Sequence, residues 1–256
     1  MRVTLDLFCQ WIEASKNIVF LGGAGVSTAS GIPDFRSEKS QSQVQLRYGV
    51  TLEELLSYHY FYEHPEQVYD FFKTFTHFSA VEPNVAHRGL ARLEKKGYPL
   101  TVITQNIDGL HQEAGNTKVL ELHGNLRHFY CSTCEKPYEK TDACFQQAAP
   151  TCPTCEGNPR GQGLIRPEMV FYEEDLDEAV WYEARRQIAH ADLLIVAGTS
   201  LSVYPAASLI EQFQGKHLVI LNQDPTPYDV QADLVIRGKV EQVLTYVSQR
   251  VKSRAN

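Results

Sequence analysis

The sequence predicts an α/β fold built around a doubly wound parallel sheet, with a smaller second domain and a helical insertion. The first observation is a series of short apolar runs that alternate with stretches of helical periodicity. The second is that most of these runs end in glycine or polar residues, as parallel strands beside a binding site do. The third is one central segment of different composition, with paired cysteines and several prolines. Together these observations indicate a Rossmann-like sheet domain that carries an added module.

The amino-terminal residues predict a short helix. Thr4 is a suitable cap for it, and Leu5, Phe8, Cys9 and Ile12 recur on one apolar face. Cys9 belongs to that face, so we expect it to be a core residue.

The first predicted strand, Ile18–Leu21, runs into a turn of glycines and small hydroxyl residues. Glycine permits close approach of the backbone, and exposed N–H groups attract anions, so this turn suits phosphate binding. Thr28 stands where a dehydrogenase fingerprint has its third glycine, so a plain strand-to-helix turn is the alternative interpretation. Phe35 and Arg36 follow, an aromatic ring and a cation placed to cover a cofactor and pair with its phosphates.

Residues 38–80 are predicted to form a helical insertion between two strands. Glu38–Gln45 is polar and lacks periodicity, so we predict a mobile loop, placed as a lid over the phosphate turn. Thr51 and Glu54 form a capping-box pattern that begins a helix. Apolar side chains then recur at helical spacing, which favours a core stripe over a binding site. They are Val68, Phe71, Phe72, Phe75 and Phe78.

A helix over Asn84–Lys96 leads to the predicted strand Leu100–Ile103. The strand runs into amides, a carboxylate and a histidine, at the position where open α/β sheets bind ligands. These residues include Gln105, Asn106, Ile107, Asp108 and His111. The next strand, Val119–Leu122, ends at His123 and Gly124. By itself such a histidine is more often a satisfied strand-end residue than a catalytic one.

Residues 126–163 carry two C-x-x-C pairs, Cys131 with Cys134 and Cys152 with Cys155, which seventeen residues separate. This spacing is typical of a zinc site made of two knuckles. Four thiolates complete a tetrahedral shell and leave no open position, so we predict one structural zinc ion per chain in a zinc-ribbon domain. The segment buries little apolar surface and needs such a staple. Cys144 lies between the pairs without a partner, and we expect a small buried or surface residue with no role in metal binding.

After residue 164 the alternation of strands and helices returns. Helices are predicted over Asp177–His190, over Pro205–Gly215 and from Val240 onward, and strands over Leu193–Ala197, Leu218–Leu221 and Leu234–Ile236. The sheet domain therefore consists of residues 1–37, 81–125 and 164–256. We expect the turns at 22–28, 104–108, 198–200 and 222–224 to gather at one edge of the sheet.

Composition excludes several classes of protein. The 256 residues are 43% hydrophobic and 21% charged, enough for a sizeable core. The net charge of −7 argues against a nucleic-acid partner. No apolar run reaches membrane-spanning length, and the amino terminus lacks the features of a signal peptide. Four of the six cysteines fall into the two C-x-x-C pairs, which points to metal binding in a reducing compartment and not to a disulfide framework. We expect a cytoplasmic protein without a membrane partner, and a monomer.

Taken together, these motifs resemble those of the sirtuins, the NAD-dependent protein-lysine deacylases, and in particular the small bacterial members. The resemblance covers nearly the whole chain, in the order of the family. The matching segments are GAGVSTASGIPDFRS at 23–37, TQNIDGLH at 104–111, His123-Gly124, the two cysteine pairs, Gly198-Thr199-Ser200 and Asn222.

The resemblance implies a role for each matching residue. Contacts to the NAD pyrophosphate and ribose correspond to Gly23, Ala24, Gly25, Thr28, Phe35 and Arg36. The pocket around nicotinamide and its ribose corresponds to Gln105, Asn106, Ile107 and Asp108. Adenosine-side contacts correspond to Gly198, Thr199, Ser200, Asn222, Lys239 and Val240. His123 corresponds to the general base, while Asn106 and Asp108 are expected to orient ribose hydroxyls, a bound water and the nicotinamide amide.

The implied reaction removes an acyl group from lysine, with NAD as co-substrate and acylated-lysine proteins or peptides as partners. The acyl oxygen attacks the ribose, nicotinamide leaves, and a base of near-neutral pKa helps a ribose hydroxyl attack the resulting imidate. The products are free lysine, nicotinamide and O-acyl-ADP-ribose.

Two features depart from, or refine, the family pattern. After Val170, family members usually carry Phe-Gly-Glu, and this chain has Phe171, Tyr172, Glu173 and Glu174. This segment is expected to pair with the substrate backbone by strand addition, so peptide preference is where the chain is predicted to differ. The tyrosine–arginine pair that favours succinyl groups in some members does not follow Arg36. We therefore expect acetyl and other uncharged acyl groups.

Two alternatives stay open. The first is a mono-ADP-ribosyltransferase of the same fold, against which His123 argues. The second is a non-enzymatic NAD-sensing module, which would need the pocket without the base. Release of nicotinamide, measured with and without an acetyl-lysine peptide, separates the three.

Overall fold

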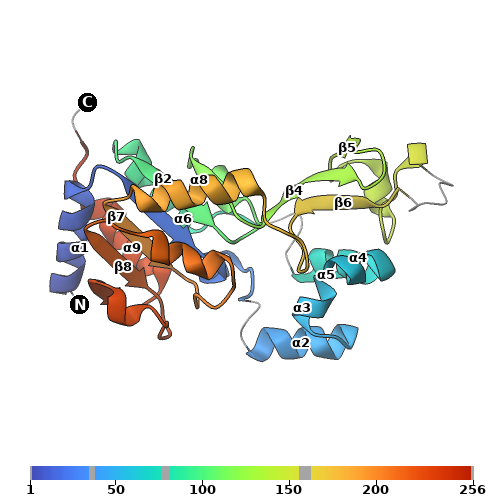
Figure 1. Cartoon of the computed structure of the whole chain (residues 1–256), viewed down its shortest axis with the longest axis horizontal. Coiled ribbons are helices and arrows are strands. Elements are labelled where there is room, and N and C mark those ends of the chain that lie inside the picture. The colour runs from blue at the N-terminus through green and yellow to red at the C-terminus, as the bar shows by residue number, and fades with distance from the viewer. Residues whose placement is uncertain (1, 35–37, 76–80, 156–162, 255–256) are drawn as a thin grey trace.

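The computed structural model describes residues 2–34, 38–75, 81–155 and 163–254; Phe35, Arg36 and Phe78 lie outside these ranges. The molecule has two lobes (Figure 1). The larger lobe contains a six-stranded sheet and the two ends of the chain, and the smaller lobe lies at the far end of the molecule. Within the described ranges, no helix has the length and apolar character that crossing a membrane requires.

All six predicted strands form one parallel sheet in the order β3-β2-β1-β7-β8-β9. Their bounds are β1 Ile18–Gly22, β2 Leu100–Thr104, β3 Val119–Glu121, β7 Leu193–Ala197, β8 His217–Leu221 and β9 Leu234–Ile236. The chain builds outward from β1 through β2 and β3, then crosses to the other side of β1 for β7, β8 and β9. This reversal between β1 and β7 creates a crevice beyond the carboxyl ends of the strands, where doubly wound sheets bind ligands.

Helical elements bury both faces of the sheet. The bounds are α1 Arg2–Ala14, α6 Val85–Lys95 and α9 Val240–Arg250 on one face, and α8 Glu178–Ala189 and the 3₁₀ helix η5 Ala206–Gln212 on the other. Strand β1 contributes alternately to the two cores, with Ile18 and Phe20 in one and Val19 and Leu21 in the other. Burial on both faces explains why these strands are continuous apolar runs in the sequence.

The smaller lobe combines the helical insertion with the cysteine-bearing segment. An antiparallel sheet of order β5-β4-β6 is formed by β4 Gly124–Cys131, β5 Pro137–Tyr138 and β6 Ile165–Met169. It shares one hydrophobic core with α3 Leu52–Leu55, α4 Tyr58–Glu63 and α5 Pro65–Phe75. The predicted aromatic stripe lies in this core, since Phe71 and Phe72 are both fully buried. Strands β4 and β6 were not predicted, and their sheet extends on both sides of residues 126–163.

The prediction of a loop over Glu38–Gln45 is wrong, because helix α2 spans Glu38–Tyr48. Val44 is its only fully buried apolar side chain, and Leu46 is 87% exposed, so the helix has no apolar stripe to detect. Its glutamate, glutamine and arginine residues are strong helix formers, and this propensity, rather than periodicity, was the available signal.

Two helix predictions also need correction. Thr4 lies inside α1 and does not cap it, because neither Arg2 nor the exposed Val3 breaks the helix. The predicted helix over Pro205–Gly215 is the 3₁₀ helix η5. Its buried residues recur at a spacing of three, Ala206 with Leu209 and Ala207 with Ile210, which is the period of a 3₁₀ helix. The remaining elements are η1 Ala24–Val26, η2 Thr28–Ser30, α7 Leu110–Glu113, η3 Ala143–Gln146, η4 Pro153–Cys155 and η6 Asp229–Gln231.

Candidate active site

The glycine turn after β1 packs directly against the turn after β7. The Gly25 N–H donates to the Gly198 carbonyl at 2.9 Å, and a Cβ on Gly25 would lie 2.8 Å from the Cα of Gly198. A Cβ on Gly23 would lie 2.7 Å from that of Thr199. Gly198 itself has a φ of +59°, which favours glycine. These glycines are therefore required because the two turns contact each other. This reason is separate from phosphate binding, which the sequence suggested.

One cleft runs along the carboxyl edge of the sheet and reaches the smaller lobe. Every predicted cofactor contact that the structure describes lies on its wall. These are Gly23, Ala24, Gly25, Thr28, Gln105, Asn106, Ile107, Asp108, His123, Gly198, Thr199, Ser200, Asn222, Lys239 and Val240. The predicted contacts Phe35 and Arg36 lie outside the described residues. The four expected turns thus meet at one edge, as the strand order requires.

A hydrogen-bond network joins the β1 turn to the β2 turn across the switch point. The Ser27 hydroxyl is fully buried and donates to Oδ2 of Asp108 at 2.6 Å. Nδ2 of Asn106 donates both to Ser27 Oγ at 3.0 Å and to the Gly23 carbonyl at 3.1 Å. The second Asp108 oxygen accepts the Leu110 N–H at 2.9 Å. Asn106 and Asp108 are therefore held in fixed orientations on the cleft wall.

His87 is buried next to Ser27 and determines which groups of this network donate and which accept hydrogen bonds. Its Nδ1 accepts the Asn84 N–H at 3.2 Å in the capping box of α6, so in the neutral ring Nε2 carries the proton. Nε2 lies 3.4 Å from Ser27 Oγ and can therefore only donate to it. Burial lowers the pKa of His87 from 6.5 to about 4, and the Arg88 charge acts in the same direction. Ser27 and His87 were not predicted as site residues. Each nevertheless belongs to a motif of the sequence, Ser27 to the glycine turn and His87 to the capping box of α6.

His123 lies in the turn between β3 and β4, half-buried on the cleft wall. Its Nδ1 lies 2.9 Å from the carbonyl oxygen of Gln105. A carbonyl oxygen only accepts, so Nδ1 carries the hydrogen in the neutral ring and Nε2 carries the lone pair. Gln105 follows β2, so the sheet edge itself sets the tautomer of this imidazole.

The residue after His123 packs closely against β6. Gly124 has a φ of +67°, and a Cβ there would lie 2.0 Å from the Glu168 carbonyl oxygen in β6. The His123 carbonyl accepts the Val170 N–H at 2.9 Å. Only glycine permits this close approach, which places the imidazole beside the segment that follows β6.

The second histidine of this region, His111, is buried and does not line the cleft. His111 is 1% exposed, and its ring packs edge-on against His87 with 4.7 Å between ring centroids. Burial, and next the neighbouring His87, lower the pKa of His111. It is therefore a neutral packing residue below the cleft.

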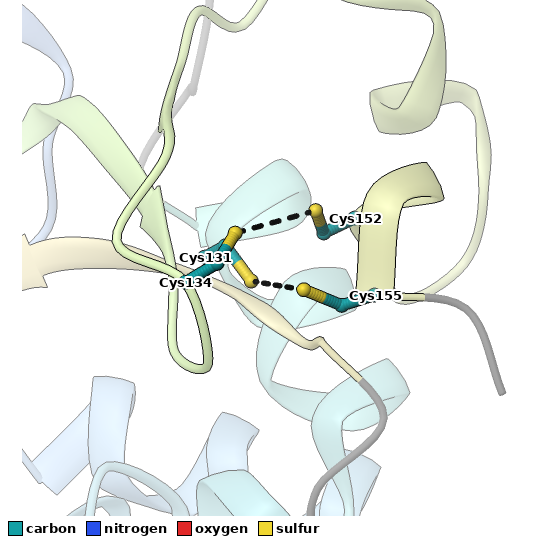
Figure 2. A group of neighbouring side chains, drawn as sticks. All are labelled: Cys131, Cys134, Cys152 and Cys155. Atoms are coloured by element: carbon teal, nitrogen blue, oxygen red, sulfur yellow. Dashed lines mark hydrogen bonds between the residues drawn. The ribbon is translucent and has the colours of Figure 1, made fainter. Parts of the chain in front are cut away.

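The four paired cysteines converge in the smaller lobe, and Figure 2 shows their side chains directed toward one another. All four sulfur atoms lie within 4.8 Å of each other. The Cys131–Cys155 and Cys134–Cys152 sulfur pairs are each 3.8 Å apart, far beyond disulfide length. Tetrahedral zinc with Zn–S bonds of about 2.3 Å places thiolate sulfurs about 3.8 Å apart, so the cluster fits zinc.

Local contacts hold this candidate zinc centre together. The Tyr138 hydroxyl donates to Sγ of Cys152 at 3.0 Å, and the Thr133 N–H donates to Sγ of Cys131 at 3.4 Å. The centre joins one knuckle beside β4 to another at η4, away from the cleft wall. Cys144 is buried in the core nearby and is not part of the cluster, so of the two expected positions, buried or surface, the structure has the buried one. The metal therefore fits a structural and not a catalytic role.

The sequence also matches a model of a known family, described as the Sir2 family, over residues 23–205. The chain belongs to the Sir2 family. This Sir2 chain is 44% identical to a protein of Cutibacterium acnes named NAD-dependent protein deacetylase, over 97% of this chain and 99% of that protein. It is 43% identical to a protein of the same name from Clostridium tetani, over 91% of this chain and 92% of that protein.

Solved Sir2 structures share the fold. One, a Sir2 with a p53 peptide and NAD⁺, aligns with a TM-score of 0.83 at 40% identity, over 96% of this chain and 97% of that one. Another, a Sir2 bound to a propionylated peptide, aligns with a TM-score of 0.81 at 39% identity and the same coverage. The resemblance to sirtuins is confirmed, and so is the predicted architecture of parallel sheet and cysteine module.

The segment after β6 is where this Sir2 chain departs from the pattern. The Tyr172 N–H donates to the Leu56 carbonyl, and the Tyr172 carbonyl accepts the Tyr58 N–H, both at 2.9 Å. The next residue, Glu173, has a φ of +76°. Glu174 is held by a bidentate pair with buried Arg166, at 2.7 and 2.8 Å. The segment therefore has a firmly anchored backbone, with a glutamate in a conformation that favours glycine.

Proposed function

We propose that this chain is an NAD-dependent protein-lysine deacetylase. The proposal is carried by one observation: the His123 imidazole, with Nδ1 held by the Gln105 carbonyl, faces the same cleft as the glycine turn and the Asn106–Ser27–Asp108 network. The names of the relatives and the ligands of the solved Sir2 structures support it. Acetylated-lysine proteins or peptides would be the partners.

The cleft has the groups that NAD needs. The Ala24 N–H has no hydrogen-bond partner within the described residues and lies in the glycine turn, where an anionic phosphate is attracted. Thr199, Asn222 and Lys239 line the other end of the cleft. Bound there, NAD supplies an electrophilic ribose carbon, which takes the acyl oxygen of the substrate as nicotinamide departs.

In this proposal the protein residues position groups and move protons. Nε2 of His123 takes the proton of a ribose hydroxyl, because His123 lines the cleft and Nε2 carries the lone pair once Nδ1 is committed to Gln105. The Asn106 amide and the Asp108 carboxylate orient hydroxyl groups and water, and Ser27 prevents both side chains from rotating. The zinc centre holds the smaller lobe, and with it the segment after β6.

Acetyl and other uncharged acyl groups are the proposed substrates. A Sir2 structure with a propionylated peptide supports this breadth. Faster release of succinyl than of acetyl from matched peptides would contradict it. We also propose the monomer, the cytoplasmic location and the domain bounds given above, for which light scattering, cell fractionation and limited proteolysis are the direct tests.

The test measures nicotinamide and O-acetyl-ADP-ribose by mass spectrometry, with and without an acetyl-lysine peptide. We expect both products only with the peptide, and a loss of about 100-fold or more in kcat for His123→Ala. His190→Ala is the matched control, because His190 is exposed and also directs Nδ1 to a backbone carbonyl, that of Arg186, at 2.8 Å. Nicotinamide release without peptide, with label on protein, would instead indicate an ADP-ribosyltransferase. Full activity of His123→Ala would refute the assignment of the base.

A further inference from the structure

Glu173 occupies an unusual position at the wall of the cleft. Its φ of +76° is a conformation that is unfavourable for a residue with a Cβ and that glycine adopts readily. The neighbouring Glu174 does not explain it, because that carboxylate is used entirely in anchoring Arg166 and the Phe171 N–H. A side chain retained in such a conformation beside a binding cleft suggests a function for its carboxylate.

The Glu173 carboxylate is held in place and still faces solvent. One oxygen accepts the His59 N–H at 3.2 Å, at the start of α4, and the His59 Nδ1 lies 2.8 Å from the other. The side chain nevertheless remains 49% exposed. A carboxylate has about four lone-pair sites, so these contacts orient it and leave capacity for a further donor.

The surface around Glu173 is acidic and aromatic. Residues 51–72 and 167–184, which meet at the Tyr58–Tyr172 backbone hydrogen bond, contain no Lys or Arg and twelve Asp or Glu. From these stretches Glu53, Glu173 and Glu174 line the cleft, where Glu174 is paired with Arg166; the cations Arg127 and Lys140 come to the lining from other segments. Tyr58 and Tyr172, which precede His59 and Glu173 in the sequence, are 43% and 39% exposed as residues, and the Tyr58 ring packs against that of Tyr62. Carboxylates beside exposed tyrosine rings suit an arginine or lysine side chain.

We propose that Glu173, with Tyr58 and Tyr172, forms a subsite for a cationic residue that flanks the acetyl-lysine of the partner protein. The inference rests on the proposed function, since it assigns the substrate class of the same cleft. The His123 carbonyl binds the Val170 N–H, three residues before Glu173, so a residue close to the modified lysine in sequence can reach the subsite. The enzyme therefore selects acetyl-lysines in basic segments.

The test compares kcat/KM for acetyl-lysine peptides that carry Arg, Gln or Glu at each position from three before to three after the modified lysine. At one position or more we expect the Arg peptide to exceed the Glu peptide by about threefold to tenfold, the range of an exposed ion pair with a fixed partner. The preference should shrink when salt is raised from 50 mM to 500 mM, because exposed charges are screened.

Three variants separate charge recognition from a structural role. Glu173→Gln keeps an acceptor for the His59 N–H and loses the charge, and Glu173→Asn is neutral and tolerates positive φ. Both should remove the Arg preference and keep the rate on the Gln peptide. Glu178→Gln, an exposed carboxylate on α8 outside the cleft wall, is the matched control and should keep the preference.

The outcomes are distinguishable from failure of the proposed function. If no acetyl peptide reacts, the proposed function itself is wrong. If the Gln peptide reacts and the Arg and Glu peptides do so equally at every position, only the subsite is refuted. An Arg preference that persists in both Glu173 variants refutes it as well, and so does a preference that Glu178→Gln removes equally.

Discussion

The buried His87 should make the fold sensitive to mild acid, and this is a sharp test of the network behind the cleft. In the folded protein its Nδ1 accepts the Asn84 N–H, so a proton on Nδ1 would oppose that N–H and remove the cap of α6. Burial accordingly lowers the pKa of His87 to about 4, whereas the unfolded chain has the ordinary value of about 6.5. Between these values the unfolded state binds more protons than the folded state, so stability falls as pH falls.

The size of the effect follows from the two pKa values. The full contribution is present above about pH 6.5 and is lost by about pH 4, on the order of 3 kcal/mol in total. At pH 5.5, relative to pH 7.5, the loss is about 1.4 kcal/mol. The suitable variant is His87→Gln, because glutamine at the third helical position preserves a capping box and does not titrate.

The assay is urea unfolding of both proteins at pH 7.5, 6.5 and 5.5, with bound zinc measured at each pH. We expect the free energy of unfolding of the wild type to fall by about 1.4 kcal/mol more than that of His87→Gln. His190→Gln, at an exposed site, is the control and should follow the wild type. The buried His111 is present in all three proteins, so its contribution cancels to first order. Equal pH dependence in wild type and His87→Gln, with zinc retained, would refute the reasoning.

Two further predictions concern the network and the metal. Ser27→Ala removes the 2.6 Å donor to the half-buried Asp108 carboxylate, so we expect a loss of about 1–3 kcal/mol in unfolding free energy and a lower kcat. The exposed Ser253→Ala should change neither, and wild-type stability of Ser27→Ala would contradict the network. We expect one zinc per chain by metal analysis. Removal of the zinc by a chelator, or the Cys152→Ser substitution, should lower the thermal midpoint of unfolding and reduce activity. Adding zinc back to the chelated protein should restore both. An unchanged midpoint after complete zinc removal would show that the thiolate cluster does not stabilise the fold.

Some elements of the fold could be predicted from the sequence pattern, and others could not. All six strands of the large sheet could be predicted, because strands buried on both faces are apolar throughout. Helix α2 could not be found by periodicity, because Val44 is its one buried apolar side chain and polar Ser40 is buried as well. Strands β4 and β6 were not predicted. Their side chains face a core that they share with α3–α5, and this core exists only in the folded protein.

The candidate site likewise combines features that local sequence implies with contacts that form only on folding. Cysteine spacing implied the metal cluster, and the motif at 104–108 implied the amide and carboxylate pair, because these are features of residue type and local order. The buried Ser27–His87 contact joins residues sixty positions apart and has no local signal. The same holds for the tautomer of His123, which the Gln105 carbonyl sets.

Local order along the chain was enough to establish the six strands of the large sheet, the glycine turn, the thiolate set and the family. Folding alone established why the glycines are needed, since Gly25 and Gly198 belong to turns that meet only at the switch point of the sheet. It also placed Glu173 in a left-handed conformation against His59, a contact between residues 114 positions apart. The physical reason is range: periodicity, spacing and capping act over a few residues, whereas close approach, tautomer and charge environment depend on partners that the chain brings together only when packed.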